Sequence, residues 1–232
     1  MELRESAGAP AVICDMDGVL LDSEPIYDES ALAFLAGLGH QATVADLEPL
    51  RGTTASGFWQ AIAAKFPLSL DVSEILRTDR ERLDRIFATH PQVVAMPGAL
   101  DLLDRLAEYG CELALASSTP ENRVTIILHR LGMLDRFRVI VTGSDVSKGK
   151  PDPEIFLAAA TRLGRQPADC VVIEDSRNGV LAAKAAGMKC VGFKTACSRQ
   201  DLSAADVVVD CFAPLTYRLL NELRAKPASV QQ

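Results

Sequence analysis

The chain has 232 residues, of which 48% are hydrophobic and 24% are charged. Its net charge of −7 leaves no basic excess to meet phosphate groups, so we expect no nucleic-acid partner and no membrane partner. No run of about 18 apolar residues exists, so no membrane-spanning helix is expected. The tract 1–10 lacks the apolar segment of a secretory signal, and the six cysteines show no CxxC spacing. We therefore expect a cytoplasmic protein with buried, reduced thiols.

The first element in chain order is a short apolar strand over residues 11–14. A different tract follows, because residues 23–96 contain helical patterns and no convincing strand. Helices are expected over residues 26–38, 56–66 and 72–89. Trp59 lies on an apolar face of the second of these helices, so we expect it to pack inside the helical tract.

From residue 97 onward, short apolar runs alternate with amphipathic helical patterns. The strand-like runs cover residues 111–116, 139–143, 170–174, 190–193 and 207–209. The helical patterns cover residues 99–109, 124–131, 153–163, 180–186 and 214–223. This alternation predicts a mostly parallel sheet with helices on both faces. We therefore expect an α/β fold: a Rossmann-like doubly wound parallel sheet built from residues 1–22 and 97–232, with a small all-helical domain inserted at residues 23–96 after the first strand.

Two carboxylates follow the first strand, at Asp15 and Asp17. Side chains two residues apart on a strand point the same way, so these two carboxylates are expected at one place. Crowded anions repel each other and usually require a cation or a shared proton. A carboxylate can also act as a nucleophile and form an aspartyl-phosphate. This pair is the first candidate for an active site, although taken alone it also fits a turn at a strand end.

The other predicted strands end in residues of complementary chemistry. In an open parallel sheet, ligands bind beyond the carboxyl ends of the strands, so these side chains should meet at one edge. The residues that follow the later strands are Ser117, Ser118, Thr119, Lys150, Glu174 and Asp175. Hydroxyls, helix N-termini and lysine bind phosphoryl oxygens, and carboxylates hold Mg²⁺. The strand ends together predict a site for a phosphate group and a hard divalent cation.

These residues also carry a family resemblance. The run DMDGVLLDSEP at residues 15–25 resembles motif I of the haloacid dehalogenase (HAD) superfamily. Ser117, Lys150 and Glu174-Asp175 resemble motifs II, III and IV in the expected order. The runs KPDPEIF and IEDSRNGV, which begin at Lys150 and at residue 173, resemble the branch that contains β-phosphoglucomutases and small-molecule phosphatases. The helical tract resembles the C1-type cap of that branch, so the likeness covers nearly the whole chain.

The resemblance implies a different role for each of the two aspartates. Asp15 would attack phosphorus and form an aspartyl-phosphate. Asp17 would protonate the leaving oxygen and then deprotonate the water that hydrolyses the intermediate. Ser117 would hydrogen-bond a phosphoryl oxygen, and Lys150 would neutralise charge on the phosphate and on Asp15.

The same resemblance implies Mg²⁺ as the cofactor. The implied ligands are the Asp15 carboxylate, the Asp17 backbone carbonyl and the Asp175 carboxylate. Glu174 would be either a further ligand or a group that supports the ligands.

Further phosphate and substrate contacts are implied beside this centre. Gly18 and Ser118 would contribute to phosphate binding. In the cap, Arg51 is the best candidate for a substrate contact, with Gly52 next to it, although Arg51 taken alone fits a surface arginine equally well.

Several positions indicate whether the substrate carries a second phosphate. A mutase-like chain would have a histidine near Tyr27, a lysine-asparagine pair in place of Pro120-Glu121, and an arginine in place of Ala55. The acid in that pair would repel a second phosphate on the substrate. The tract ASSTP at residues 116–120 instead resembles sugar-phosphate phosphatases.

We therefore expect a Mg²⁺-dependent phosphatase that acts on a small phosphate ester, with a sugar phosphate as the favoured class. A β-phosphoglucomutase-type mutase is the alternative within the same site. A non-catalytic regulator remains open because fold alone does not define function. A dehalogenase would not need the Asp17 acid or the metal-binding carboxylates. We expect a monomer or a weak homodimer.

Overall fold

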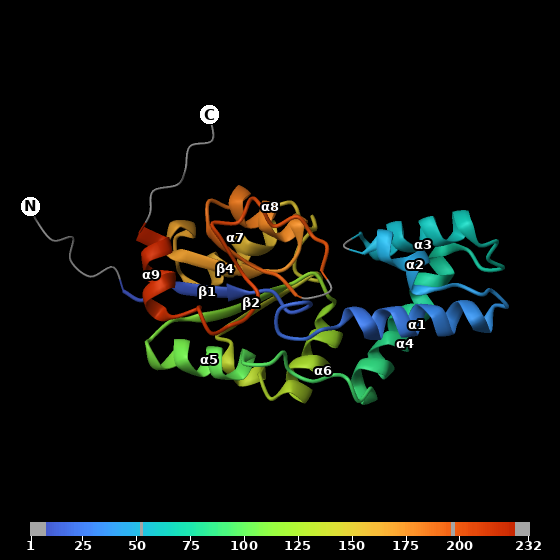
Figure 1. Ribbon diagram of the computed structural model, residues 1–232, viewed down its shortest axis with the longest axis horizontal. Helices are drawn as coiled ribbons and strands as arrows, with labels where there is room; N and C mark the ends of the chain where they lie inside the picture. The colour runs from blue at the N-terminus through green and yellow to red at the C-terminus, as the bar shows by residue number, and fades with distance from the viewer. Residues whose placement is uncertain (1–7, 52, 196–197, 226–232) are drawn as a thin grey trace, which may run out of the picture.

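The computed structural model describes residues 8–51, 53–195 and 198–225 (Figure 1). A six-stranded sheet forms its centre, with strand order β3-β2-β1-β4-β5-β6 and parallel pairing throughout. The strands are β1 (Ala11–Cys14), β2 (Leu113–Ser117), β3 (Val139–Thr142), β4 (Cys170–Glu174), β5 (Lys189–Phe193) and β6 (Val207–Val209). Strands β1, β2, β4 and β5 are buried along their whole length, as expected for a parallel sheet covered on both faces. The doubly wound α/β fold is confirmed.

Helices cover both faces of the sheet because alternate strand residues face two separate cores. Helices α5 (Ala99–Glu108), α6 (Glu121–Leu131) and α9 (Tyr217–Ala225) pack on the face that carries Val12 and Cys14. Helices α7 (Glu154–Leu163) and α8 (Arg177–Ala185) pack on the opposite face, against Ala11 and Ile13 (Figure 1). Short 3-10 turns occur at Glu48–Leu50, Leu134–Arg136 and Pro167–Asp169.

Four helices separate β1 from α5. They are α1 (Glu24–Gly37), α2 (Val44–Leu47), α3 (Ala55–Lys65) and α4 (Val72–Thr89), and the described part of this tract contains no strand. Figure 1 shows them beside the sheet, on the side toward which β1 points. They have a hydrophobic cluster of their own that includes Leu35, Ile62 and Ile75. The helical insert is therefore a cap over the carboxyl ends of the strands, while its boundaries at residues 23 and 96 stay a prediction.

The cap is packed internally and anchored on the core. Trp59 is 2% exposed, and its Nε1 donates to Asp79 Oδ2 at 3.0 Å, which confirms the predicted packing role. Near the C-terminal end of α4, Phe87 is fully buried in a hydrophobic cluster that also contains buried residues of α6. Arg123 of α6 donates to Asp84 of α4 at 3.0 Å. The second half of α4 thus holds the cap on the core.

Some element boundaries differ from the predicted ones. Helices α6 and α8 begin three residues before the predicted starts at 124 and 180, because their first turns are polar and the apolar pattern starts only at Val124 and Val180. Helix α9 begins at Tyr217 rather than at 214, because residues 212–216 form turns stabilised by backbone hydrogen bonds. The four-residue helix α2 was not predicted, since it is too short to show a period.

Two further expectations concern burial and membranes. Cys14, Cys111, Cys170 and Cys190 are buried free thiols, as predicted. Cys211 is exposed, and Cys197 lies outside the described residues. Within the described ranges, no helix combines the length and apolar character that a membrane crossing requires.

Candidate active site

Asp15 lies at the centre of the sheet's carboxyl edge. It directly follows β1, and its backbone N–H donates to the Ile173 carbonyl of β4 at 3.0 Å. The residue is 5% exposed, so its carboxylate has little contact with water. Its Oδ1 accepts a hydrogen bond from Lys150 Nζ at 2.6 Å. The strand end and the lysine together fix the position of this carboxylate.

Lys150 bridges two carboxylates. Besides Asp15, its Nζ donates to Glu174 Oε1 at 2.8 Å and to the Ala116 carbonyl at 3.3 Å, so all three ammonium hydrogens have an acceptor. Burial alone would lower the pKa of Lys150, but Asp15 and Glu174 outweigh burial and raise this pKa above its ordinary value. Lys150 is therefore a permanent positive charge, placed between Asp15 and Glu174.

Glu174 is held in place on both of its oxygens. Oε1 accepts from Lys150, while Oε2 accepts from the Ser176 backbone N–H at 2.6 Å and from the Ser176 hydroxyl at 2.9 Å. The same Ser176 hydroxyl accepts from the Gly179 N–H in the first turn of α8. A side chain at Gly179 would clash, because an added Cβ would lie 1.7 Å from Glu174 Oε1. These contacts make Glu174 better suited to orient Lys150 than to serve as a free metal ligand.

Three carboxylates lie close enough to hold one cation. Oxygen atoms of Asp15, Glu174 and Asp175 all lie within 4.8 Å of one another. Burial raises the pKa of Asp15 to about 7 despite the opposing effect of Lys150, and Glu174 and Asp17 add to the rise. Burial likewise raises the pKa of Asp175 well above its ordinary value, followed in effect by Glu174 and Asp15.

This donor set fits Mg²⁺. Hard oxygen ligands and an excess of negative charge suit a small divalent cation, which would offset the repulsion among the carboxylates. The loop after β1 approaches the cluster through Gly18, which has a positive φ of 75° and leaves room for Asp175. Asp15 and Asp175 are the carboxylates with capacity for a metal, because both oxygens of Glu174 already have partners.

The two carboxylate oxygens of Asp17 have different surroundings. Oδ2 accepts a hydrogen bond from the Thr119 hydroxyl at 2.8 Å. Oδ1 is buried and has no hydrogen-bond partner among the described residues. A threonine directly before a proline predicts a helix cap, but Pro120 itself occupies the cap position of α6 and the Thr119 hydroxyl turns to Asp17.

The neighbouring hydroxyls differ in accessibility. Ser117 ends β2 next to β1, is completely buried, and accepts the Thr119 N–H at 3.1 Å through its Oγ. Ser118 is exposed at the surface of the same turn. The Ser118 carbonyl would lie 2.3 Å from a Cβ at Gly143, so that glycine allows the turn to pack closely. The structure therefore places one buried and one accessible serine at the predicted phosphate position.

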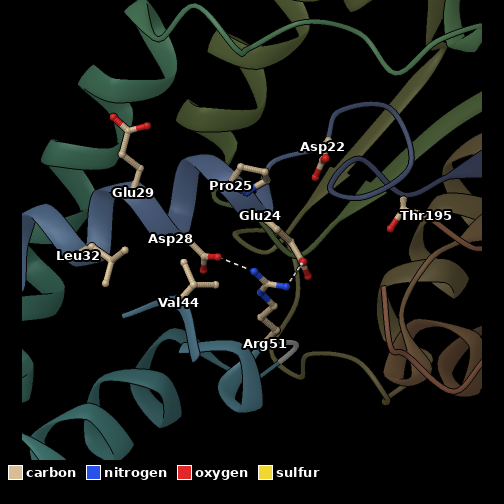
Figure 2. Close-up of a pocket in the computed structure, with 9 residues that line it drawn as sticks. All are labelled: Asp22, Glu24, Pro25, Asp28, Glu29, Leu32, Val44, Arg51 and Thr195. Carbon is tan, nitrogen blue, oxygen red and sulfur yellow. Dashed lines mark hydrogen bonds and ion pairs between the residues drawn. The ribbon is translucent and has the colours of Figure 1, made fainter. Parts of the chain in front are cut away.

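The cap residues lie in a separate group. Arg51 is partly buried rather than a surface side chain: its Nη1 lies 3.1 Å from Glu24 and its Nη2 lies 2.5 Å from Asp28 (Figure 2). Gly52, the other predicted cap residue, lies outside the described residues. Tyr27 of α1 is partly buried, and its hydroxyl interacts with Thr119 and Arg123. Burial, with the nearby Asp17 carboxylate, raises the pKa of Tyr27 above its ordinary value.

Comparison with known proteins agrees with this geometry. Residues 9–187 match the haloacid dehalogenase-like hydrolase family. The chain is 36% identical over 183 residues to the putative phosphatase YhcW of Bacillus subtilis, covering 78% of this chain and 81% of that protein. It is 33% identical over 224 residues to the β-phosphoglucomutase of the same organism, covering 91% and 94%.

The chain is also similar to part of a longer protein and to solved structures. The chain covers 19% of the chloroplastic protein SUPPRESSOR OF QUENCHING 1 of Arabidopsis thaliana, at 36% identity and over 84% of this chain. The crystal structure of CbbY from Rhodobacter sphaeroides with phosphate has a TM-score of 0.80 at 28% identity, covering 92% of this chain and 99% of that one. A mutant of CbbY was crystallised with xylulose-(1,5)bisphosphate. The chain belongs to the haloacid dehalogenase-like hydrolase family, in the branch with β-phosphoglucomutase relatives.

Proposed function

We propose that the chain is a Mg²⁺-dependent phosphatase that hydrolyses a small organic phosphomonoester, with a sugar phosphate as the favoured class. One observation carries the proposal: the Lys150 ammonium donates to both Asp15 and Glu174, beside Asp175. A nucleophilic carboxylate needs a neighbouring cation both to remain ionised inside the protein and to attract a phosphate dianion. Lys150 lowers the pKa of Asp15 against the effect of burial and supplies positive charge beside it, and a bound Mg²⁺ would add to both effects.

The reaction proceeds in two steps on Asp15. An Asp15 oxygen forms a bond to phosphorus while the bond from phosphorus to the ester oxygen breaks, and Asp17 gives its proton to that leaving oxygen. Asp17 then removes a proton from water, the water oxygen bonds to phosphorus, and the bond to Asp15 breaks to release inorganic phosphate. Asp17 has one carboxylate oxygen held by Thr119, which leaves the other for these proton transfers.

The remaining residues stabilise charge and position. Asp15, Asp175 and the backbone carbonyl of Asp17 would hold Mg²⁺, with Glu174 as their support through Lys150. When bound, Mg²⁺ would supply positive charge next to the transferring phosphoryl group. Ser117 and Lys150 would contact the phosphoryl oxygens, with Gly18 and Ser118 beside them. Removing one such charge-stabilising group typically costs about 3–4 kcal/mol of transition-state stabilisation.

A phosphosugar mutase is the second candidate, since the chain aligns with almost the full length of a β-phosphoglucomutase. A mutase must bind a second phosphate, and Glu121, which is exposed at the start of α6, disfavours a further anion. Purified protein with Mg²⁺ should release inorganic phosphate from hexose phosphates. Conversion of β-glucose 1-phosphate to glucose 6-phosphate with negligible phosphate release would contradict the phosphatase assignment and establish the mutase.

The cellular context stays a prediction. We expect a cytoplasmic location and a monomer or weak homodimer, with a small-molecule substrate rather than a nucleic-acid or membrane partner. Light scattering at several protein concentrations would test the oligomeric state.

A further inference from the structure

A cavity of about 340 Å³ separates the cap from the loops that follow β1 and β5 (Figure 2). It is lined by Asp22, Glu24, Pro25, Asp28, Glu29, Leu32, Val44, Arg51 and Thr195. Two of these residues relate the cavity to the proposed active site. Asp22 lies on the loop that starts at Asp15, and Thr195 follows β5, the neighbour of the strand that carries Glu174. The cavity therefore lies at the carboxyl edge of the sheet, where the rest of a bound phosphate ester would extend toward the cap.

The charge of this cavity is unusual for a site that binds phosphate esters. The described residues of its lining include four carboxylates and one guanidinium, a net of three negative charges if all are ionised. Burial raises the pKa of Glu24, Arg51 opposes the rise, and Asp28 and Asp22 add to it. The carboxylates are thus close enough to repel one another, and a further anion that enters the cavity meets the same repulsion.

The single arginine in the lining is already engaged. Arg51 lies between Glu24 at 3.1 Å and Asp28 at 2.5 Å, one on each terminal nitrogen. Both acids lie on α1, one helical turn apart, so they form a fixed fork around the guanidinium. A second phosphate or a carboxylate of a substrate would compete with these two acids for the guanidinium and would meet their negative charge. A hydroxyl or an ammonium group would instead find carboxylate acceptors in place.

We propose that Glu24 and Asp28 determine substrate specificity: by holding Arg51 they restrict the enzyme to phosphomonoesters whose leaving group carries no second anionic group, namely polyol and amino-polyol monophosphates. The proposal rests on the proposed phosphatase function and narrows its substrate class. The fold by itself does not impose this limit, since the related CbbY mutant was crystallised with a bisphosphate. The limit is therefore assigned to side chains of this chain, and it should disappear when they lose their charge.

Matched pairs of esters test the proposal, because the members of each pair differ mainly in the charge far from the phosphate. Suitable pairs are 2-hydroxyethyl phosphate with phosphoglycolate, sorbitol 6-phosphate with 6-phosphogluconate, and glucose 6-phosphate with glucosamine 6-phosphate. Phosphate release with Mg²⁺ gives kcat/KM for each compound, and competition with p-nitrophenyl phosphate gives an inhibition constant where turnover is slow. We expect the neutral member of the first two pairs to exceed the anionic member by about tenfold or more. Glucosamine 6-phosphate should at least equal glucose 6-phosphate.

Substitutions then locate the origin of the preference. The double variant Glu24→Gln/Asp28→Asn frees Arg51 and should bring the neutral-to-anionic ratio close to one. The matched control Glu81→Gln removes an exposed cap carboxylate outside the cavity and should keep the wild-type ratio. Should the double variant fail to fold, added salt tests the wild type directly. Screening between charges weakens repulsion, so the ratio should fall as the salt concentration rises.

The outcomes distinguish a failure of the specificity proposal from a failure of the proposed phosphatase function. Similar kcat/KM values for neutral and anionic partners in the wild type would overturn the specificity proposal while the phosphatase function stands. An unchanged ratio in a folded double variant would do the same. No phosphate release from any of the esters or from p-nitrophenyl phosphate would overturn the proposed function itself.

Discussion

Gly18 and Asp175 lie so close that a side chain at position 18 would overlap the carboxylate, because an added Cβ would lie 2.0 Å from Asp175 Oδ2. The two residues are 157 positions apart in the chain and meet only because β1 and β4 are neighbours in the sheet. The backbone at Gly18 also has a φ of 75°, which disfavours any side chain. This contact lets the loop after the proposed nucleophile approach the proposed metal ligand.

Gly18→Ala should therefore damage the metal site more than the fold. We expect a loss of about 1–2 kcal/mol in the free energy of unfolding from the left-handed backbone. Displacement of Asp175 should also raise the Mg²⁺ concentration needed for half-maximal activity. Titration of activity with Mg²⁺ and a denaturant curve measure the two effects. Gly37→Ala is the control, since Gly37 ends α1 with no atom within 4 Å of an added Cβ. Unchanged Mg²⁺ dependence in Gly18→Ala would contradict the assignment of Asp175 as a ligand.

Thr119→Val removes the single described hydrogen bond to the Asp17 carboxylate. Because that bond fixes the orientation of the proposed acid and base, we expect kcat to fall by about tenfold or more, with a smaller change in KM. Thr119→Ser retains the hydroxyl and should retain most of the activity. Thr125→Val is the control, because the Thr125 hydroxyl donates to a backbone carbonyl on the exposed side of α6. Equal kcat in the Val and Ser variants would show that the hydroxyl has no positioning role.

The buried Asp15 should give the metal-free protein a specific pH dependence. Burial raises the pKa of Asp15 from 3.8 to about 7, so the folded state prefers the protonated carboxyl. Its contribution to stability is complete below the unfolded pKa and declines as the pH rises through the folded pKa. In EDTA, the thermal midpoint of the wild type minus that of Asp15→Asn should therefore fall between pH 3.8 and about pH 7.

Mg²⁺ should reduce that fall, because it binds the ionised carboxylates and offsets their repulsion. Differential scanning calorimetry with EDTA and with Mg²⁺ measures both curves. A midpoint difference that does not vary with pH, or that Mg²⁺ does not alter, would argue against a buried metal-binding carboxylate at Asp15.

The strand ends were the most predictable part of the molecule. A short apolar run followed at once by polar residues predicts a buried parallel strand that delivers side chains to one edge, and Asp15, Lys150 and Glu174 do meet there. The strands at residues 170–174 and 207–209 also match their predicted bounds. The local pattern was sufficient at residues 170–174 because a strand buried on both faces has to be apolar throughout. The partly exposed edge strand at residues 207–209 is a run of three valines, a residue type that favours strands.

Contacts between distant segments could not be read from local patterns. The hydrogen bond from Thr119 to Asp17 and the fork of Glu24 and Asp28 around Arg51 depend on how a loop and the cap pack in space. Thr119 before a proline looks like an ordinary helix cap, and only its tertiary neighbour reveals another role. From the sequence alone Arg51 fits a surface residue and a substrate contact equally well, because its two acidic partners lie 27 and 23 positions earlier in the chain.

Asp15 is proposed to carry the phosphoryl group during turnover. The most direct measurement is acid quenching of the wild type in the presence of substrate and Mg²⁺, followed by peptide mass analysis. One phosphoryl group is expected on Asp15 in the wild type, and neither phosphorylation nor phosphate release is expected in Asp15→Asn. A phosphoryl group on another residue, or wild-type turnover by Asp15→Asn, would contradict this role of Asp15.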